Sequence, residues 1–300
     1  MTGRLIIDTV DAYTAFGVFV TEGGYKDLMA YPDLKPVEVN DWWEHDGVEA
    51  DLSAPALDVK SFPISFAHTG YEPRLNEFIA HITDGAYHDF EFADLGLTFR
   101  LRLESQSAYD LLRGLGLFSL SFSDDFPLKD YVYVAPANGI ARSEGNTLDD
   151  VDFSEYGITV LEGTAADVLK IAAIKGNLLQ NASGLYGAAY DGEFVKMGKK
   201  EIRLNLLIRA TTLSDLWNNY YAFLYDLVQP DERTLLLSFD TLQHNCYYQS
   251  GSVDVIIPSE CWMKFSITLA VANSGIREDA LYFYINGQPF LFNNENVLIN

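Results

Sequence analysis

The amino-acid sequence predicts a mainly β (α+β) protein of two tandem β-sandwich or β-barrel domains, each with one flanking α-helix. Three observations support this fold class. Segments of the first half return in the second half, short β-rich segments alternate apolar and polar residues, and each half holds one amphipathic stretch. A polar, turn-rich stretch near the middle sets the predicted domains at 1–148 and 149–300.

The repeat covers most of the chain. Residues 16–23, Phe-Gly-Val-Phe-Val-Thr-Glu-Gly, return as residues 156–163, Tyr-Gly-Ile-Thr-Val-Leu-Glu-Gly, 140 positions later. A later match, residues 118–122 with 265–269, has a spacing of 147. A spacing that only grows is expected if the second copy carries short insertions, so we interpret the chain as a tandem duplication. Further matches at a spacing of 140 are Leu34-Lys35 with Ile174-Lys175, Gly47 with Gly187, and Asp51 with Asp191.

Each predicted domain opens with a short β segment that runs into a Gly-containing turn, at residues 16–20 and 156–161. Long irregular stretches follow at 33–60 and 173–199, and they are rich in Gly, Asp, Asn and Ala. We interpret each stretch as two strands joined by a protruding hairpin.

A strand and then a helix come next in each half. Phe62–Phe66 and Ile202–Leu206 place apolar residues at every second position, which predicts strands with one buried face. Pro63 cannot donate to a ladder and favours an edge position for the first of these strands. Leu75–Ile82 and Leu213–Leu227 carry apolar residues at helical spacing and predict helices that lie on a sheet; Thr212 or Ser214 could cap the second helix, and Pro230 ends it.

The remaining strands follow the helices, and each half ends in a predicted hairpin. Asn138-Gly139 and Asn286-Gly287 lie beside β-rich runs, the strongest short signal for a hairpin turn. The predicted strands are 87–92, 97–103 and 115–122 in the first half and 234–239, 245–250 and 263–271 in the second; the predicted hairpins begin at 131–134 and 281–284.

Charge and composition narrow the classes of function. The formal net charge is −23, and the first half holds 26 Asp and Glu against 10 Lys and Arg. So acidic a chain does not bind nucleic-acid phosphates by counterion release, although the charge also serves plain solubility. With 14% aromatic and 48% hydrophobic residues, the chain is expected to fold, and the sequence predicts no signal peptide or spanning helix.

Motifs for catalysis are missing. The sequence contains no phosphate-binding glycine loop, nucleophile elbow or metal-spaced histidine pair, so we predict no enzyme activity, no cofactor and no metal. His81 and His88 lie near acidic residues, but Phe223 and Leu235 stand in their place in the second half. Solvated surface histidines are therefore favoured over catalytic ones. Asp149, Asp150 and Asp152 lack calcium-loop spacing and are interpreted as a solvated linker.

Two adjacent tryptophans, Trp42 and Trp43, stand in the acidic first hairpin. Neighbouring residues on a strand point to opposite faces, so both cannot enter one core. Two interpretations stay open: one Trp lies at a subunit interface, or one folds back onto its own domain. The candidate interface residues are Trp42, Trp43, Glu44, Asp46, Leu185 and Tyr186.

The second half resembles the distal tail and tail-tube protein superfamily of long-tailed bacteriophages. The resemblance is carried by Asp152-Phe153-Ser154-Glu155-Tyr156-Gly157-Ile158, by Gly187 and Asp191 before the strand at 202–206, by the helix at 213–227, and by the closing strand at 264–269. The first half keeps the same order with a weaker start at Thr14–Val18.

The resemblance implies a β-sandwich with a helix that assembles into six-fold rings around a channel. Chains with two such domains resemble baseplate hub proteins, in which a trimer supplies six similar domains; a hexamer is the other option. It further implies other tail proteins as partners, passage of DNA without specific binding, no membrane, and synthesis in the bacterial cytoplasm before incorporation into a virion tail. The alternative function is a carbohydrate- or protein-binding β-sandwich module, since exposed Trp and Tyr stack on sugars.

Overall fold

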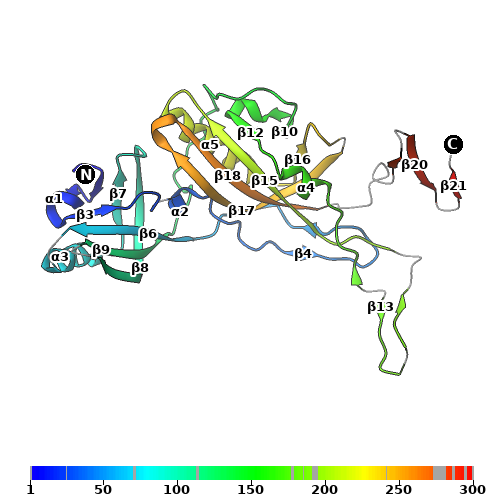
Figure 1. Ribbon diagram of the computed structural model, residues 1–300, viewed down its shortest axis with the longest axis horizontal. Helices are drawn as coiled ribbons and strands as arrows, with labels where there is room; N and C mark the ends of the chain where they lie inside the picture. Colours follow the sequence, from blue (N-terminus) through cyan, green and yellow to red (C-terminus); the bar gives the residue numbers. More distant parts are fainter. Residues whose placement is uncertain are drawn as a thin grey trace.

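The computed structural model describes residues 2–300 apart from 25, 70–71, 113–114, 177–178, 185, 191–194, 241, 273–281, 286–287, 294–295 and 299–300. For residues 72–73, 107–112, 115, 190 and the described residues after 281 it describes the backbone alone. The chain is mainly β, and the predicted fold class is confirmed: two curled antiparallel sheets each carry one long helix (Figure 1).

The first sheet has seven strands in the order β2-β1-β7-β8-β9-β6-β3. Strand β8 is long and changes register twice against β9, which lets the sheet curl around its own core. The core is aromatic, with Phe66, Phe90 and Phe122 fully buried. The strands are β1 (Leu5–Ile7), β2 (Val10–Asp11), β3 (Val18–Val20), β6 (Lys60–Thr69), β7 (His88–Phe92), β8 (Leu97–Leu112) and β9 (Leu115–Asp124).

The second sheet has the same strand order as the first, β11-β10-β16-β17-β18-β15-β12. Its long strand β17 also bulges against its neighbour β18. Strand β10 belongs to this sheet, although its residues lie before the boundary we place after residue 148; that division of the chain stays a prediction. The strands are β10 (Thr147–Leu148), β11 (Val151–Asp152), β12 (Ile158–Val160), β15 (Lys200–Arg209), β16 (Arg233–Leu236), β17 (Gln243–Ile257) and β18 (Trp262–Val271).

Both predicted long helices are present. Helix α3 (Glu72–Thr83) buries Phe78 and Ile82, and α5 (Leu213–Leu227) buries eight side chains. Thr212 caps α5 through a hydrogen bond from the Asp215 amide. Shorter helices also occur in both halves: α1 (Ala12–Phe16) and α2 (Lys26–Met29) in the first, η1 (Phe153–Tyr156), α4 (Thr164–Leu169) and η3 (Pro258–Glu260) in the second.

Each half sends out a hairpin as the sequence predicts. We call residues 28–59 the first arm and residues 168–199 the second arm. The first arm contains β4 (Val39–Asn40) and β5 (Glu49–Ala50), and the second contains β13 (Leu179–Gln180) and β14 (Ala189–Tyr190). In Figure 1 the first arm runs beneath the second sheet, whereas the hairpin of the second arm projects away from both sheets.

The hairpin predicted at 131–139 is wrong. These residues form no strand; they lie along α5 and the second sheet, where Gly139 makes a single bridge to Ala210. The partners for this backbone come from the second half, since the Ala137 amide donates to Asn219. The later hairpin is confirmed, with β19 (Tyr282–Ile285) pairing with β20 (Gln288–Asn293), followed by β21 (Asn296–Leu298); its Asn286-Gly287 turn lies outside the described residues.

Pro63 does not mark an edge strand. Strand β6 lies between β9 and β3, with Pro63 opposite Ser121 of β9. On its other side the ladder with β3 covers only Phe66 to His68, so Pro63 sits beyond the end of β3, where no amide is required. Among the described residues, no helix is long and apolar enough to span a membrane.

Candidate assembly interface

The first arm joins the two halves through a buried aromatic cluster. Tyr31, just after α2, stacks on Tyr220 of α5 with ring centroids 4.1 Å apart and meets the ring edges of Tyr248 and Phe265. Its side chain is 3% exposed. Burial raises the pKa of Tyr31, Tyr220 and Tyr248 well above the usual tyrosine value, so all three hydroxyls stay protonated and able to donate.

Every hydroxyl in this cluster donates to a backbone carbonyl across the junction. The Tyr220 hydroxyl donates to the Met29 carbonyl at 2.8 Å, and the Tyr248 hydroxyl donates to the Pro32 carbonyl at 2.8 Å. The Tyr31 hydroxyl donates to the Tyr220 carbonyl. Buried polar atoms that are all satisfied fix one geometry. The two halves therefore meet in a defined orientation.

Beyond the cluster, the first arm lies across the second sheet by backbone hydrogen bonds. The Leu34 amide donates to the Gln249 carbonyl at 2.8 Å, and the Val48 amide donates to the Ala272 carbonyl at 2.9 Å. Leu52 is buried against Tyr247 and Ala270. The arm thus spans the sheet from its root to its tip.

The tip of the first arm is held at the root of the second arm. Lys175, whose side chain is 8% exposed, donates to the carbonyls of Trp42 and Gly47 at 2.7 and 2.9 Å and pairs with Asp41. The Met197 amide donates to the Asp46 carboxylate at 2.7 Å. A buried ammonium with several acceptors is the arrangement expected for a lysine that organises a loop.

The structure separates the candidate residues predicted from sequence. Asp46 contacts the second half, whereas Trp42 and Trp43 are 50% and 65% exposed. Neither Trp enters the core; Trp43 is mainly exposed, whereas Trp42 is half covered within its own hairpin, and a subunit interface at these residues stays a prediction. The Trp42 indole donates to Glu49 at 2.9 Å. Glu44 and Tyr186 are exposed at the two arm tips, and Leu185 lies outside the described residues.

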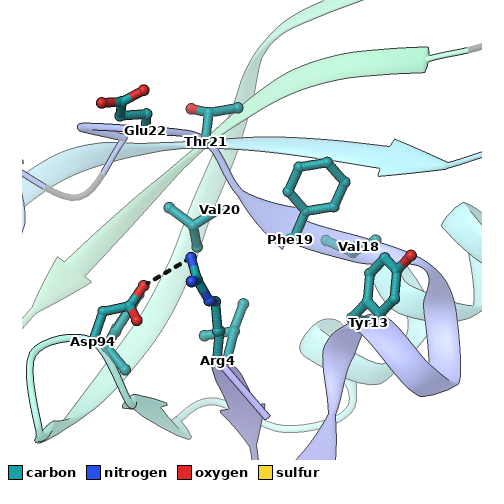
Figure 2. Close-up of a pocket in the computed structure, with 10 residues that line it drawn as sticks. Arg4, Tyr13, Val18, Phe19, Val20, Thr21, Glu22 and Asp94 are labelled. Atoms are coloured by element: carbon teal, nitrogen blue, oxygen red, sulfur yellow. Dashed lines mark ion pairs between the residues drawn. The ribbon is translucent and has the colours of Figure 1, made fainter. Parts of the chain in front are cut away.

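One cavity adjoins the first arm, and another lies in the first half away from both arms. One, of about 440 Å³, lies beside the first arm tip and is lined by Trp42, His45 and Glu232 among others. The other, of about 410 Å³, lies between β1 and β3, and Figure 2 shows Arg4 directed toward Asp94 and Tyr13 beside Phe19. Arg4 and Asp94 form an exposed ion pair at 3.5 Å. Neither of these two linings pairs a nucleophile with a base.

A buried lysine also lies near the junction. Lys60, at the start of β6, donates to the carbonyls of Leu28 and Ala30. Burial lowers the pKa of Lys60 to about 7, opposed by nearby Asp124, Asp27 and Asp33. Burial likewise raises the pKa values of Asp124 and Asp33. A small cavity of about 240 Å³ adjoins Lys60 and Asp124 and reaches α5.

The titratable pairs outside the junction are structural. His88 is buried and contacts the Asp8 carboxylate at 2.5 Å, so the expectation of a solvated surface histidine is wrong for His88. Asp8 lies in the turn between β1 and β2, 80 positions before His88 in the sequence. The residues next to His88 in the sequence therefore give no sign of this contact. His244 pairs with Asp240 in the second half. Within the described part of the chain, no group of three or more His, Cys, Asp or Glu is placed to hold a metal ion.

Sequence reasoning missed the residues that carry the junction. Tyr31, Tyr220 and Tyr248 come from segments about 190 and 220 positions apart, and no local pattern joins them. Lys175 was visible as the counterpart of Lys35, and its repeat position was the available signal. Asp11 was also missed as the counterpart of Asp152, because their spacing is 141 rather than 140.

The chain has a structural neighbour among known proteins. No family model and no curated protein matches the chain. Among solved structures, it is similar to the Dit protein of phage SPP1, described as a paradigm of hub adsorption apparatus in Gram-positive infecting phages. That match has 13% identity and a TM-score of 0.32, and it covers 89% of this chain and 98% of the other.

Proposed function

We propose that this protein is a self-assembling structural subunit of a phage or prophage tail, acting as a tube, distal tail or baseplate hub protein. Its copies form a ring around a DNA channel, either as a trimer with six similar domains or as a hexamer. The observation that best supports this proposal is that the two sheets have the same strand order and that the first arm lies across the second sheet. In a tandem duplication, the same contact can repeat between copies.

Charge and chemistry agree with a structural role. The net charge of −23 would let DNA pass a channel without sticking to its wall. The aromatic junction, with its satisfied hydroxyls, is built to hold an orientation rather than to turn over a substrate. Synthesis in the bacterial cytoplasm, incorporation into a virion tail and contacts with other tail proteins are part of this proposal, as is an interface that uses the arm tips with Trp42, Trp43, Glu44, Asp46, Leu185 and Tyr186.

Negative-stain microscopy and analytical ultracentrifugation of the purified chain over a wide concentration range test this function. Rings or short tubes with three-fold or six-fold symmetry are the expected result. The proposal would be contradicted if the chain stayed monomeric at the highest concentration, both alone and with other tail proteins from the same gene neighbourhood.

A binding module is the second candidate, and it is favoured by Trp42 beside a cavity and by the exposure of both Trp42 and Trp43. Aromatic faces that are open to solvent stack on sugar rings. A glycan array compares the wild-type chain with Trp42→Ala and Trp43→Ala. Binding that depends on both residues supports the module, and an array without binding removes this candidate.

A further inference from the structure

Where both arms are described, the same backbone pairs recur in them at a spacing of 140. The bridge between Leu34 and Leu57 has its counterpart between Ile174 and Met197. The hairpin pairs of β4–β5 and β13–β14 are in the same register. The hydrogen bond from the Lys35 amide to Ala56 likewise returns from Lys175 to Lys196, each at 2.8 Å. Residues 140 apart in the arms are therefore structural counterparts.

Counterparts in the two arms differ in their exposure to solvent. Met29 and Tyr31 are 2% and 3% exposed; the Tyr31 ring packs against α5 and the second sheet, and Tyr220 of α5 bonds to the Met29 carbonyl. Leu169 and Ile171, in the same positions of the second arm, are 50% and 66% exposed. Ile174, the counterpart of Leu34, is 53% exposed. The second arm thus presents the apolar row that the first arm buries.

The lysines show the opposite difference. Lys175 is buried because it receives the tip of the first arm. Its counterpart Lys35 is exposed. Lys175 binds the carbonyls of Trp42 and Gly47 at the tip of the first arm. The corresponding carbonyls at the tip of the second arm are those of Ala182 and Gly187. Gly47 and Gly187 share a left-handed backbone, with φ of 72° and 80°, so the two tips turn alike.

The first sheet offers the same receiving position as the second sheet. The Leu34 amide bonds to Gln249, which is the extra residue of a bulge between Tyr248 and Ser250 in β17. Strand β8 has its own bulge between Leu103 and Ser105, and Glu104 is the extra residue there. A bulge exposes a backbone carbonyl and bends the strand, and bulges are positioned features rather than defects.

We propose that the second arm of one copy lies across the first sheet of another copy, as the first arm lies across the second sheet within the chain. In this contact Ile171 and Ile174 are buried near the Glu104 bulge, and Lys35 of the receiving copy donates to the Ala182 and Gly187 carbonyls. The contact is head-to-tail, so it builds a ring or a filament. It rests on the proposed function, because it names the surfaces by which the subunits associate.

The second copy is the occupant that the structure supports. The second arm resembles the first arm, and the first arm lies across a seven-stranded sheet, the second sheet. The second arm is therefore expected to lie across a sheet with the same strand order. Within the chain, the first sheet has this order and lies on the far side of the second sheet from the projecting hairpin (Figure 1). Another copy therefore supplies the matching sheet.

Sedimentation velocity tests the contact with three variants of the full chain. Ile171→Asp/Ile174→Asp disables the arm and is expected to weaken self-association more than about 100-fold, since two apolar side chains lose their burial. Lys35→Glu disables the receiver and is expected to weaken it about 10-fold or more. Leu179→Asp is the matched control: Leu179 is exposed, but its counterpart Val39 stays exposed although the first arm is docked, so no change is expected.

Mixing decides the head-to-tail geometry. The arm variant has an intact receiver and the Lys35→Glu variant has an intact arm, so together they form one-to-one dimers at concentrations where neither assembles alone. All substituted residues are exposed, and circular dichroism melts check that each variant folds. Wild-type assembly with an unaffected arm variant would overturn this contact and leave the proposed function standing. Loss of assembly without complementation would overturn the head-to-tail geometry, and a wild-type chain that never associates would overturn both.

Discussion

The first arm and the second arm have the same hydrogen-bonded frame and opposite surroundings. In the first arm, Tyr31 is buried in an aromatic cluster; in the second, Ile171 is among the most exposed apolar residues of the described chain. Local sequence sets the shape of each arm, and the neighbouring sheet decides what each arm buries. The comparison shows that burial in this protein is a property of the junction between sheets.

A second comparison concerns the lysine that begins the strand after each arm. Lys60 and Lys200 both donate to carbonyls of the preceding short helix or its end. Lys60 lies opposite Asp124 in the sheet, whereas Lys200 lies opposite Val271. The first half therefore surrounds its lysine with carboxylates, which fits its larger share of the acidic charge.

Removing Tyr31 should have the largest effect on stability. Tyr31→Ala leaves a cavity among Tyr220, Tyr248 and Phe265, and we expect a loss of about 3–5 kcal/mol in the free energy of unfolding. Ile171→Ala should change it by less than about 0.5 kcal/mol in the monomer, because the side chain is exposed. Urea denaturation at a concentration where the chain is monomeric measures both. Equal losses for the two variants would break the comparison of the arms.

The pH dependence of stability should separate the two lysines. The folded-state pKa of Lys60 is about 7, below that of a lysine in the unfolded chain, so the unfolded state binds more protons above pH 7. The free energy of unfolding should therefore gain a rising contribution from pH 7 to pH 9. Denaturation across this range should show that contribution in the wild type and in Lys200→Met, and lose it in Lys60→Met. A slope in Lys60→Met equal to that of the wild type would contradict the assignment.

The two helix caps should instead behave alike. Asp11 accepts from the Thr14 amide and Asp152 from the Ser154 amide, each at 2.8 Å, and Gly17 and Gly157 end the short helices with φ of 73°. Asp11→Ala and Asp152→Ala should each cost about 1 kcal/mol, while the Asn variants keep the acceptor and cost less. Thermal or urea unfolding measures them. A cost at only one position would show that the halves do not share this turn.

Sequence alone predicted the parts of the fold that depend on local periodicity. Alternation at Phe62–Phe66 and helical spacing at Leu213–Leu227 found β6 and α5, because each has one buried face. It failed at 131–139, where an Asn-Gly signal was overridden by contacts to Asn219 and Ala210 of the second half. The aromatic junction could not be predicted, since its members are brought together only by the packing of the two halves.

The candidate site shows the same limit. Sequence identified the arm tips by their acidic residues and tryptophans, and of these Asp46 does hold the tip of the first arm; the other side-chain contacts that hold it come from Tyr31 and Lys175. Exposure of Trp42 and Trp43 follows from a hairpin that extends beyond its own sheet, which periodicity does not measure. The repeat spacing is the most useful signal, since it pairs Lys35 with Lys175 from the order of residues alone.

The smallest effect should come from the turn carboxylates of the two sheets. Asp8 contacts His88 at 2.5 Å, and Asp149 contacts Arg233 at 2.8 Å, and each also accepts an amide from the neighbouring strand. Partial burial raises the pKa of Asp8, but hydrogen bonds from the Asp89 amide and His88 outweigh it, so the net pKa is lowered and the carboxylate is ionised at pH 5.5. Asp8→Asn and Asp149→Asn should each cost about 0.5 kcal/mol, the range of partly exposed ion pairs.

The lowered pKa of Asp8 sets how its small cost depends on pH. A carboxylate whose folded-state pKa lies below its unfolded value contributes stability above the unfolded pKa and loses it as pH falls through the folded pKa. The cost of Asp8→Asn should therefore be the same at pH 8 and pH 5.5 and shrink as pH falls below about 4. Each value is a difference from the wild type at one pH, so groups elsewhere cancel. A cost that is undiminished at pH 3 would mean that the ionised carboxylate is not the source of this stabilisation, and the correspondence between the two turns would then rest on the backbone alone.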